Sequence, residues 1–350
     1  MRGSERARGR RQPGVSAPGD ARRRTALTVL GISTAGFLVW LAGCSEPADL
    51  DQPRGERPAF DGGAALALVE RQVAFGPRVP NTPAHADALA FLADFLRARA
   101  EAVSLEPFSH VIETPERFEP GPQEGDTLRL TNVFASFAPA AGRRILLAAH
   151  WDSRPVAERD PDPGRRREPI PGANDGASGV AVLLALAELF ARHPLPVGVG
   201  VDLLLLDGED YGHDPFSLQT LQRDMFLGAK EFVRAHPGYR PRWSILLDMV
   251  GDAEPGFPRE GNSLEFAPDL VRRVWDTARD LGYGHLFTDE PVTSVTDDHV
   301  HLSRGGIPTI GIIDFDYDAW HTSADTPDKL SAETLDAVGE MMLELVYNRL

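Results

Sequence analysis

The feature that most limits the fold is a series of short, almost uninterrupted apolar runs. Val199–Leu206 is apolar at nearly every position, as in central strands whose two faces are both covered. Similar runs lie at 144–149, 244–249 and 309–313. Segments with helical apolar spacing separate or follow them at 177–191, 226–235, 269–281 and 332–347. This alternation predicts an α/β protein, a three-layer α/β/α sandwich with a mixed, mainly parallel central sheet.

The residues before this alternation are predicted to form two helices, at 64–74 and 84–102, followed by a strand at 128–137. The sequence has no internal repeat and no second break in composition within this part. A chain of 350 residues allows one large domain or two ordinary ones, and we therefore expect one large domain at 62–350.

The first 43 residues have the pattern of an export signal. Arg22–Arg24 precede an apolar run, Ala26–Leu41, and the motif L-A-G-C ends at Cys44. A basic segment, a short apolar segment and small residues are typical of a secretory signal. The motif resembles the lipobox of bacterial lipoproteins, which implies a lipid on Cys44; the alternative is an ordinary buried cysteine that follows an anchor. We expect a lipoprotein signal peptide at 1–43 and a tether rich in proline and charge at 44–61.

Composition excludes several classes of function. The formal net charge is −16, whereas nucleic-acid-binding proteins carry a positively charged surface. The chain has one cysteine, so it has neither an internal disulfide framework nor a cysteine-rich zinc site. Any metal site would have to use histidine and carboxylate ligands.

Histidine and acidic residues follow the predicted strands. In open α/β sheets, ligands bind beyond the carboxyl ends of the strands. Six groups are placed there by their positions in the sequence: His150, Asp175, Glu209, Asp210, Asp248 and His321. Buried charges need a partner or a metal, and imidazole and carboxylate ligands without thiolate suit a catalytic Zn²⁺ with an open position.

Each of these residues has a structural alternative when it is taken alone. Asp175 is placed to cap a helix, Glu209 and Asp210 are compatible with a solvated turn, and His321 with a surface loop. Trp320 is compatible with a core position and Asp297 with a helix cap before His299. The joint occurrence of the six groups at strand ends, in this order, favours the metal site.

The ordered motifs resemble those of peptidase family M28, the zinc peptidases. They are H-W-D at 150–152, G-A-N-D-G-A-S-G at 172–179, D-G-E-D at 207–210, L-D-M-V-G at 247–251, D-D-H at 297–299 and W-H-T at 320–322. The resemblance implies that Asp175, Asp210 and His321 bind zinc and that Glu209 is the general base and acid. In the dinuclear aminopeptidases of the family, His150 and Asp248 would hold a second zinc, with Asp152 orienting His150.

Within that family the motifs are most similar to those of glutaminyl cyclases. Trp320 stands directly before His321, and Asp297 replaces the small residue usual in aminopeptidases. This resemblance implies one zinc, a proton-handling network of Glu209, Asp248 and Asp297, and substrate contacts from Trp320 and His299. The implied reaction is cyclisation of an N-terminal glutamine with release of ammonia.

Two departures from the cyclase pattern leave alternatives open. The loop after D-G-E-D contains no tryptophan, so Phe216 or Phe226 is expected to replace the second aromatic wall of animal cyclases. The second acidic ligand is Asp210 rather than glutamate, and its shorter side chain requires the backbone to approach the metal. Because His150 and Asp248 are both present, a dinuclear aminopeptidase remains the alternative, followed by a non-catalytic peptide-binding lipoprotein.

These expectations also define partners and location. The predicted substrates are peptide or protein N-termini, with no nucleic acid partner. A lipid on Cys44 would place a monomeric enzyme on the extracytoplasmic side of a membrane, facing the periplasm.

Overall fold

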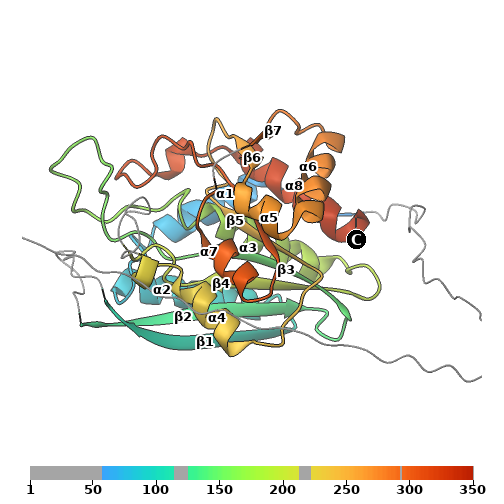
Figure 1. The fold of residues 1–350 in the computed structure, drawn as a ribbon, viewed down its shortest axis with the longest axis horizontal. Coiled ribbons are helices and arrows are strands. Elements are labelled where there is room, and N and C mark those ends of the chain that lie inside the picture. The colour runs from blue at the N-terminus through green and yellow to red at the C-terminus, as the bar shows by residue number, and fades with distance from the viewer. Residues whose placement is uncertain (1–56, 114–124, 213–221, 292–293, 350) are drawn as a thin grey trace, which may run out of the picture. The chain divides into compact units, whose positions relative to one another are not determined.

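The computed structural model describes residues 57–113, 125–212, 222–291 and 294–349 (Figure 1). Cys44, the predicted signal peptide and the tether up to residue 56 lie outside the described residues. Residues 57–349 belong to one compact unit. None of the described helices is both long enough and apolar enough to cross a membrane.

A six-stranded mixed sheet forms the centre of this unit. Its strands, in spatial order, are β1 (Ala102–Val111), β2 (Thr127–Phe137), β4 (Val199–Leu206), β3 (Arg143–His150), β5 (Trp243–Asp248) and β8 (Thr309–Ile313). The strands β4, β3, β5 and β8 are parallel to one another, whereas β2 is antiparallel to both β1 and β4. The parallel strands therefore end together at one edge of the sheet.

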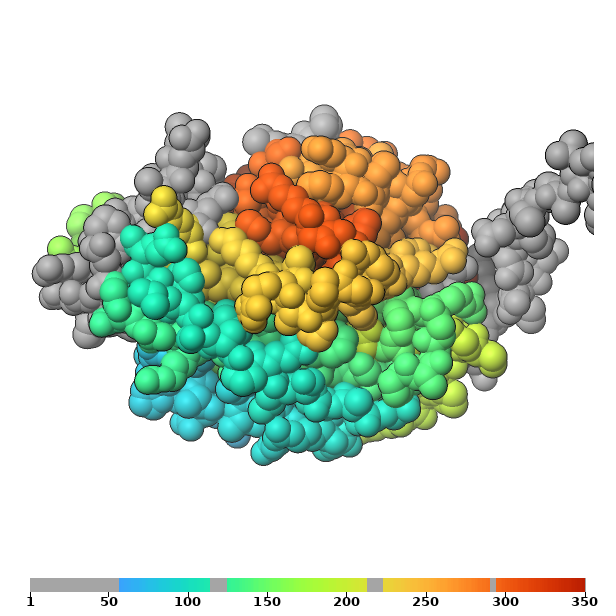
Figure 2. Space-filling view, turned by 60° about the horizontal axis from the view of Figure 1, so that its bottom comes forward, coloured from blue at the N-terminus to red at the C-terminus, as the bar shows by residue number. Residues whose placement is uncertain are grey.

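Helices cover both faces of the sheet. One face carries α1 (Gly62–Val73), α2 (Pro83–Arg97), α3 (Ser178–Arg192), α6 (Pro268–Asp280) and α8 (Ala332–Asn348). The other face carries α4 (Leu227–Ala235) and α7 (Asp298–Arg304), which lie side by side in Figures 1 and 2. Smaller elements are α5 (Gly261–Phe266), the short parallel pair β6 (Phe257–Arg259) and β7 (Phe287–Pro291), and 3-10 turns at Gln222–Asp224 and Pro327–Lys329.

Alternation along β3 shows why the apolar runs are continuous. Ile145, Leu147 and Ala149 point into the core under α3 and α8, and Leu146 and Ala148 point into the core under α4 and α7. Every second residue is thus buried on each face, as in strands covered on both sides. The predicted α/β/α sandwich with a mainly parallel sheet is confirmed.

The largest difference from the sequence prediction is at 84–102. The helix α2 ends at Arg97, and β1 begins at Ala102. The strand β1 lies at the edge of the sheet, contains Pro107 and is partly exposed on both faces, so it has neither a continuous apolar run nor a strict alternation. The positions of α5, α7, β6 and β7 were also not predicted, because each is short and none contains a continuous apolar run.

The packed part begins before residue 62. Arg57 forms ion pairs with Glu340 and Glu344, and Phe60 is buried against Gly339 of α8. The last residues of the predicted 44–61 tether therefore belong to the folded unit, because α8 offers them two carboxylates and, at Gly339, a position without a side chain.

Candidate active site

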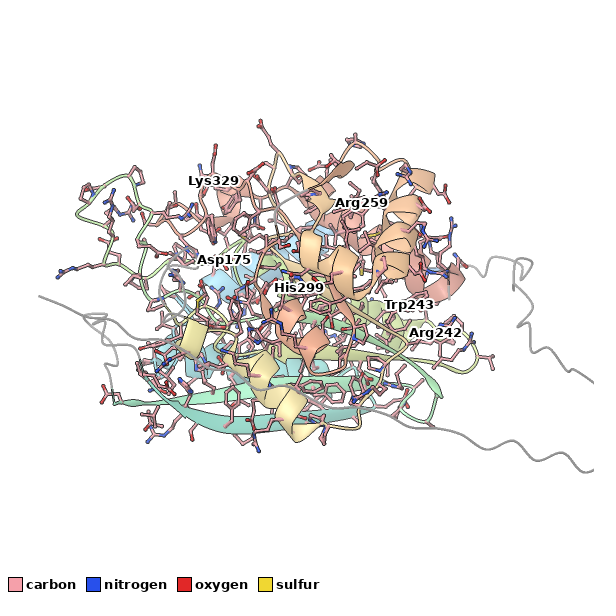
Figure 3. The ribbon with its side chains drawn as sticks, viewed as in Figure 1. Asp175, Arg242, Trp243, Arg259, His299 and Lys329 are labelled. Atoms are coloured by element: carbon pink, nitrogen blue, oxygen red, sulfur yellow. The ribbon has the colours of Figure 1, made fainter. Side chains whose placement is uncertain are left out.

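The predicted metal and catalytic residues meet at the carboxyl edge of the parallel strands. His150 is the last residue of β3, and Asp248 is the last residue of β5. Glu209 and Asp210 follow β4, Asp175 precedes α3, and His321 lies in the loop after β8. All six side chains are buried, with exposures of 2–8%. Asp175 is labelled in Figure 3, where it is drawn above β1 and β2 in the view of Figure 1.

The first cluster contains Asp175, Asp210 and His321. One ligand atom from each lies within 4.8 Å of the others. The Nε2 atom of His321 is 3.7 Å from Asp175 Oδ2 and 3.6 Å from Asp210 Oδ1. Among the described residues, Asp175 Oδ2 and Asp210 Oδ2 have no hydrogen-bond partner although both are buried. Buried carboxylate oxygens without partners are costly unless a cation binds them, so this donor set fits Zn²⁺.

A second cluster shares Asp175 with the first. His150 Nε2 is 3.2 Å from both Asp175 Oδ1 and Asp248 Oδ1. His150 Nδ1 is 3.6 Å from Asp152, whose carboxylate also accepts hydrogen bonds from the backbone N–H groups of Glu209 and Asp210. Asp175 thus faces one histidine with each oxygen, which is the placement expected of a residue that bridges two metals.

The turn that carries Asp175 depends on glycine. Gly176 has a φ of 101°, which L-residues with a side chain rarely adopt. A Cβ at this position would lie 2.2 Å from the carbonyl oxygen of Asp152. The backbone N–H groups of Asn174 and Asp175 donate to Asp325. The Gly-rich motif therefore brings the Asp175 loop against the loop after β3.

Burial and neighbouring charges shift the proton affinities of the carboxylates. Burial raises the pKa of Glu209 well above its ordinary range, and Asp210 and Asp297 add to the shift. Burial also raises the pKa of Asp248 to about 6, although contact with His150 opposes the change. Glu209 lies 3.9 Å from His150. Carboxyl groups with raised pKa values are suited to accept and return a proton near neutral pH.

A cavity of about 450 Å³ opens beside the first cluster. Its wall combines the acidic groups Asp175, Glu209, Asp210, Asp248 and Asp297 with the apolar side chains of Met225, Phe226, Met249, Val295, Phe315 and Trp320. Apolar pockets with a few convergent polar groups are typical of small-molecule and substrate sites.

Trp320 is both a packed residue and part of the cavity wall. Its side chain is 7% exposed. Its ring centroid lies 4.1 Å from that of His321 and 4.8 Å from that of Phe315. The two interpretations left open by the sequence are therefore compatible, because the ring is fixed by packing and still borders the cavity.

Asp297 likewise both caps a helix and lines the cavity. One oxygen accepts a hydrogen bond from the backbone N–H of Asp298 and caps α7. The other oxygen, Oδ2, has no hydrogen-bond partner among the described residues, and the side chain lines the cavity. The helix cap positions the carboxylate that faces the site.

The predicted substrate contact of His299 is corrected by the structure. His299 is fully buried and is not part of the cavity wall; Figure 3 shows it beneath α5. Its Nε2 is 3.0 Å from Glu260, and its Nδ1 is 3.5 Å from Asp297 Oδ2. Helix α7 turns the side chain inward, so His299 supports Asp297 from behind.

The second aromatic wall is found at Phe226. This residue lines the cavity and has a φ of 56°. Met249 and His321, with φ values of 48° and 57°, also line it. Such backbone conformations in non-glycine residues often mark functional sites. The other candidate, Phe216, lies outside the described residues.

Sequence reasoning did not single out Arg154 and Glu158. Arg154 is fully buried and donates hydrogen bonds to Asp210 and Glu158. Glu158 in turn is 2.7 Å from His321 Nδ1. The only signal available was that both residues follow the H-W-D motif in the stretch S-R-P-V-A-E.

The fold and the histidine–carboxylate donor set define a zinc metalloenzyme. The chain belongs to peptidase family M28: residues 132–346 match the family model.

Known proteins similar to this chain include glutaminyl cyclases and an aminopeptidase precursor. A solved glutaminyl cyclase from Bacteroides thetaiotaomicron, bound to N-acetylhistamine, is 39% identical, with a TM-score of 0.76 over 83% of this chain and 99% of that one. A leucine aminopeptidase precursor from the same organism is 40% identical, with a TM-score of 0.75 over 83% and 98%. The glutaminyl-peptide cyclotransferase-like protein of Bos taurus is 24% identical over 90% of this chain and 87% of its own length.

Proposed function

We propose that the chain is a zinc-dependent glutaminyl-peptide cyclotransferase that converts the N-terminal glutamine of peptides to pyroglutamate and releases ammonia. The observation that carries the proposal is the cavity. It joins the Asp175–Asp210–His321 cluster to the Trp320 ring and to the carboxylates of Glu209, Asp248 and Asp297. The similarity to glutaminyl cyclases supports the same function.

The cavity wall orients the substrate. Trp320, Phe226 and Phe315 offer flat apolar surfaces that fold the glutamine side chain back toward its own α-amine. Holding the two reacting groups in contact makes an intramolecular attack efficient. Zinc bound by Asp175, Asp210 and His321 would polarise the side-chain carbonyl as a Lewis acid.

The carboxylates move the proton. A bond forms between the α-nitrogen and the side-chain amide carbon, and the bond from that carbon to its amide nitrogen breaks. Glu209 accepts a proton from the α-amine and returns it to the departing ammonia. Asp248 and Asp297 hold the amine as hydrogen-bond acceptors. Since an α-amine has a pKa of about 7.7–8, a carboxylate with a raised pKa is a sufficient base.

Zinc depletion tests this proposal. Protein stripped with a chelator is expected to lose pyroglutamate formation from Gln-aminocoumarin, and added Zn²⁺ is expected to restore it. The variant Asp175→Ala should not be restored by zinc. Full turnover by the stripped protein or by this variant would contradict the proposal.

An aminopeptidase is the second candidate. The His150–Asp175–Asp248 cluster favours it, as does the similarity to the leucine aminopeptidase precursor. The zinc content per chain distinguishes the two functions. One tightly held zinc is expected for the cyclase, whereas two tightly held ions together with release of leucine from Leu-aminocoumarin would favour the peptidase.

We also propose that the enzyme is a monomer anchored by a lipid on Cys44 and faces the periplasm. The L-A-G-C motif after a short apolar run supports this location. The wild type is expected in the membrane fraction with a lipid-modified N-terminal cysteine, and Cys44→Ser should lack that modification. An unmodified cysteine in the wild type would contradict the anchor.

A further inference from the structure

The segment Arg154–Asp160 joins three parts of the site that are distant in the sequence. It follows β3 through the H-W-D motif, and its side chains contact the loop after β4 and the loop after β8. None of its residues was assigned a role by the motifs. Its contacts fall on Asp210 and on the turn Trp320–Ser323.

Glu158 fixes the proton on His321. Its Oε1 lies 2.7 Å from His321 Nδ1. An ionised carboxylate only accepts hydrogen bonds, so Nδ1 carries the proton and Nε2 keeps its lone pair. That lone pair belongs to the atom that lies 3.7 Å from Asp175 Oδ2 and 3.6 Å from Asp210 Oδ1. A metal-binding histidine generally needs such a partner to fix its tautomer and ring orientation.

Arg154 fixes the other ligand. Its guanidinium is fully buried, and it donates to Asp210 Oδ1 from Nη1 and to Glu158 from Nε. The Nε–Oε2 distance to Glu158 is 2.8 Å. With Oδ1 held in this way, Oδ2 of Asp210 is left without a hydrogen-bond partner among the described residues. The guanidinium thus holds the short aspartate side chain in one orientation beside His321.

Two more contacts hold the turn that carries His321. The backbone N–H of Arg159 donates to the His321 carbonyl at 3.2 Å, and the Arg159 guanidinium lies 3.9 Å from the centre of the Trp320 ring. Asp160 accepts a hydrogen bond from the Ser323 N–H at 3.0 Å. His321 has a φ of 57°, and such strained conformations persist where several contacts enforce them.

We propose that Arg154 and Glu158 are positioning residues for the zinc site: Glu158 sets the His321 tautomer, Arg154 sets the Asp210 carboxylate, and Arg159 and Asp160 hold the Trp320–His321 turn. The proposal rests on the zinc site of the proposed function. It is tested through the zinc affinity and the His321 tautomer. The positioning role can therefore fail while the cyclase function holds, and the cyclase function can fail while the positioning role holds.

The test compares two substitutions at one residue of the full-length chain. Glu158→Ala removes the acceptor for Nδ1, whereas Glu158→Gln keeps a carbonyl oxygen there. Zinc dissociation constants are measured by competition with a chelator. The His321 tautomer is measured by ¹⁵N NMR of the zinc-free protein, with its signals assigned by their loss in His321→Gln. Glu168→Ala is the matched control, because Glu168 lies in the same loop and its one ion pair among the described residues is with the exposed Arg165.

Glu158→Ala is expected to weaken zinc binding on the order of 10- to 100-fold and to shift the proton partly from Nδ1 to Nε2. Glu158→Gln should keep the Nδ1–H tautomer and bind zinc more tightly than Glu158→Ala. Arg154→Met should also weaken zinc binding, with Arg165→Met as its control. If Arg154→Met does not fold, the two Glu158 variants decide. Wild-type zinc affinity with an unchanged tautomer in Glu158→Ala would overturn the proposal, even if the variant unfolds at a lower temperature.

Discussion

At the scale of single residues, Asp297 connects folding with chemistry. One of its oxygens caps α7, the other lies 3.5 Å from His299 Nδ1, and the side chain lines the cavity. His299 lies behind it and Glu260 behind His299. The capping interaction and the proposed interaction with the substrate amine can be separated by substitution, because asparagine and aspartate are equally good helix caps.

Asp297→Asn keeps the helix cap and loses only the charge that pairs with His299, so it is expected to melt at a higher temperature than Asp297→Ala while lowering kcat for Gln-aminocoumarin about 100-fold or more. Asp297→Ala should lower both, since loss of a cap costs ~1 kcal/mol. Thermal unfolding and steady-state kinetics check the two effects. Near wild-type kcat in Asp297→Asn would mean that the residue is only a cap.

Glu209 provides the second test at this scale. Glu209→Gln removes the base without removing any of the three proposed zinc ligands. Turnover is expected to fall by about 10²- to 10⁴-fold, and the zinc content should stay unchanged. Zinc content and steady-state kinetics are measured on the same sample. If the variant loses zinc together with activity, Glu209 is a zinc ligand rather than the general base.

At the scale of elements, the position of α3 determines where Asp175 lies. Gly179, in the first turn of α3, packs directly on β5: a Cβ there would lie 2.2 Å from the carbonyl oxygen of Leu247. Leu247 precedes Asp248, so this contact fixes the start of α3, which follows Asp175, against the end of β5, which carries Asp248.

Gly179→Ala is expected to lower the free energy of unfolding by ~2 kcal/mol or more, because backbone must shift to admit the methyl group. Gly142→Ala is the control, since a Cβ at Gly142 meets nothing within 4 Å; it should be neutral or slightly stabilising. Urea denaturation measures both. Equal stabilities for the two variants would show that α3 is not packed this closely on β5.

The buried pair of His299 and Glu260 links α7 to α5. Burial alone would lower the pKa of His299, but contacts with Asp297 and Glu260 outweigh it and raise the pKa to about 9. The folded pKa is thus above the usual value of 6.5. The contribution of protonated His299 to the free energy of unfolding is therefore complete below pH 6.5 and is lost as the pH rises through about 9.

The stability difference between wild type and His299→Gln should therefore narrow between pH 6.5 and pH 9. Urea denaturation at several pH values measures it, with a substitution at the exposed His193, His193→Gln, as the control. A difference that stays constant over this range would mean that His299 is neutral in the folded protein.

At the scale of the whole molecule, the sequence predicted the parts whose pattern follows from burial. The bounds of β4 and β8 agree with the predicted 199–206 and 309–313, because strands covered on both faces leave continuous apolar runs. The convergence of His150, Asp210 and Asp248 follows from the same topology, since parallel strands end at one edge.

The remaining features have no local pattern. The strand β1 is an edge strand with partial exposure on both faces, and no period distinguishes it from a loop. The contacts of Glu158 with His321 and of Asp160 with Ser323 each span 163 residues. Such pairs depend on how two loops meet in the folded molecule, so Arg154 and Glu158 could not be recognised from their spacing.

The most direct test of the account is a competition between two substrates for the zinc-loaded wild-type protein. An equimolar mixture of peptides that differ only in an N-terminal glutamine or leucine is incubated with the protein, and mass spectrometry follows both. The account predicts that the glutamine peptide loses ammonia and becomes the pyroglutamyl peptide while the leucine peptide stays intact. Release of free leucine without any pyroglutamyl product would contradict it.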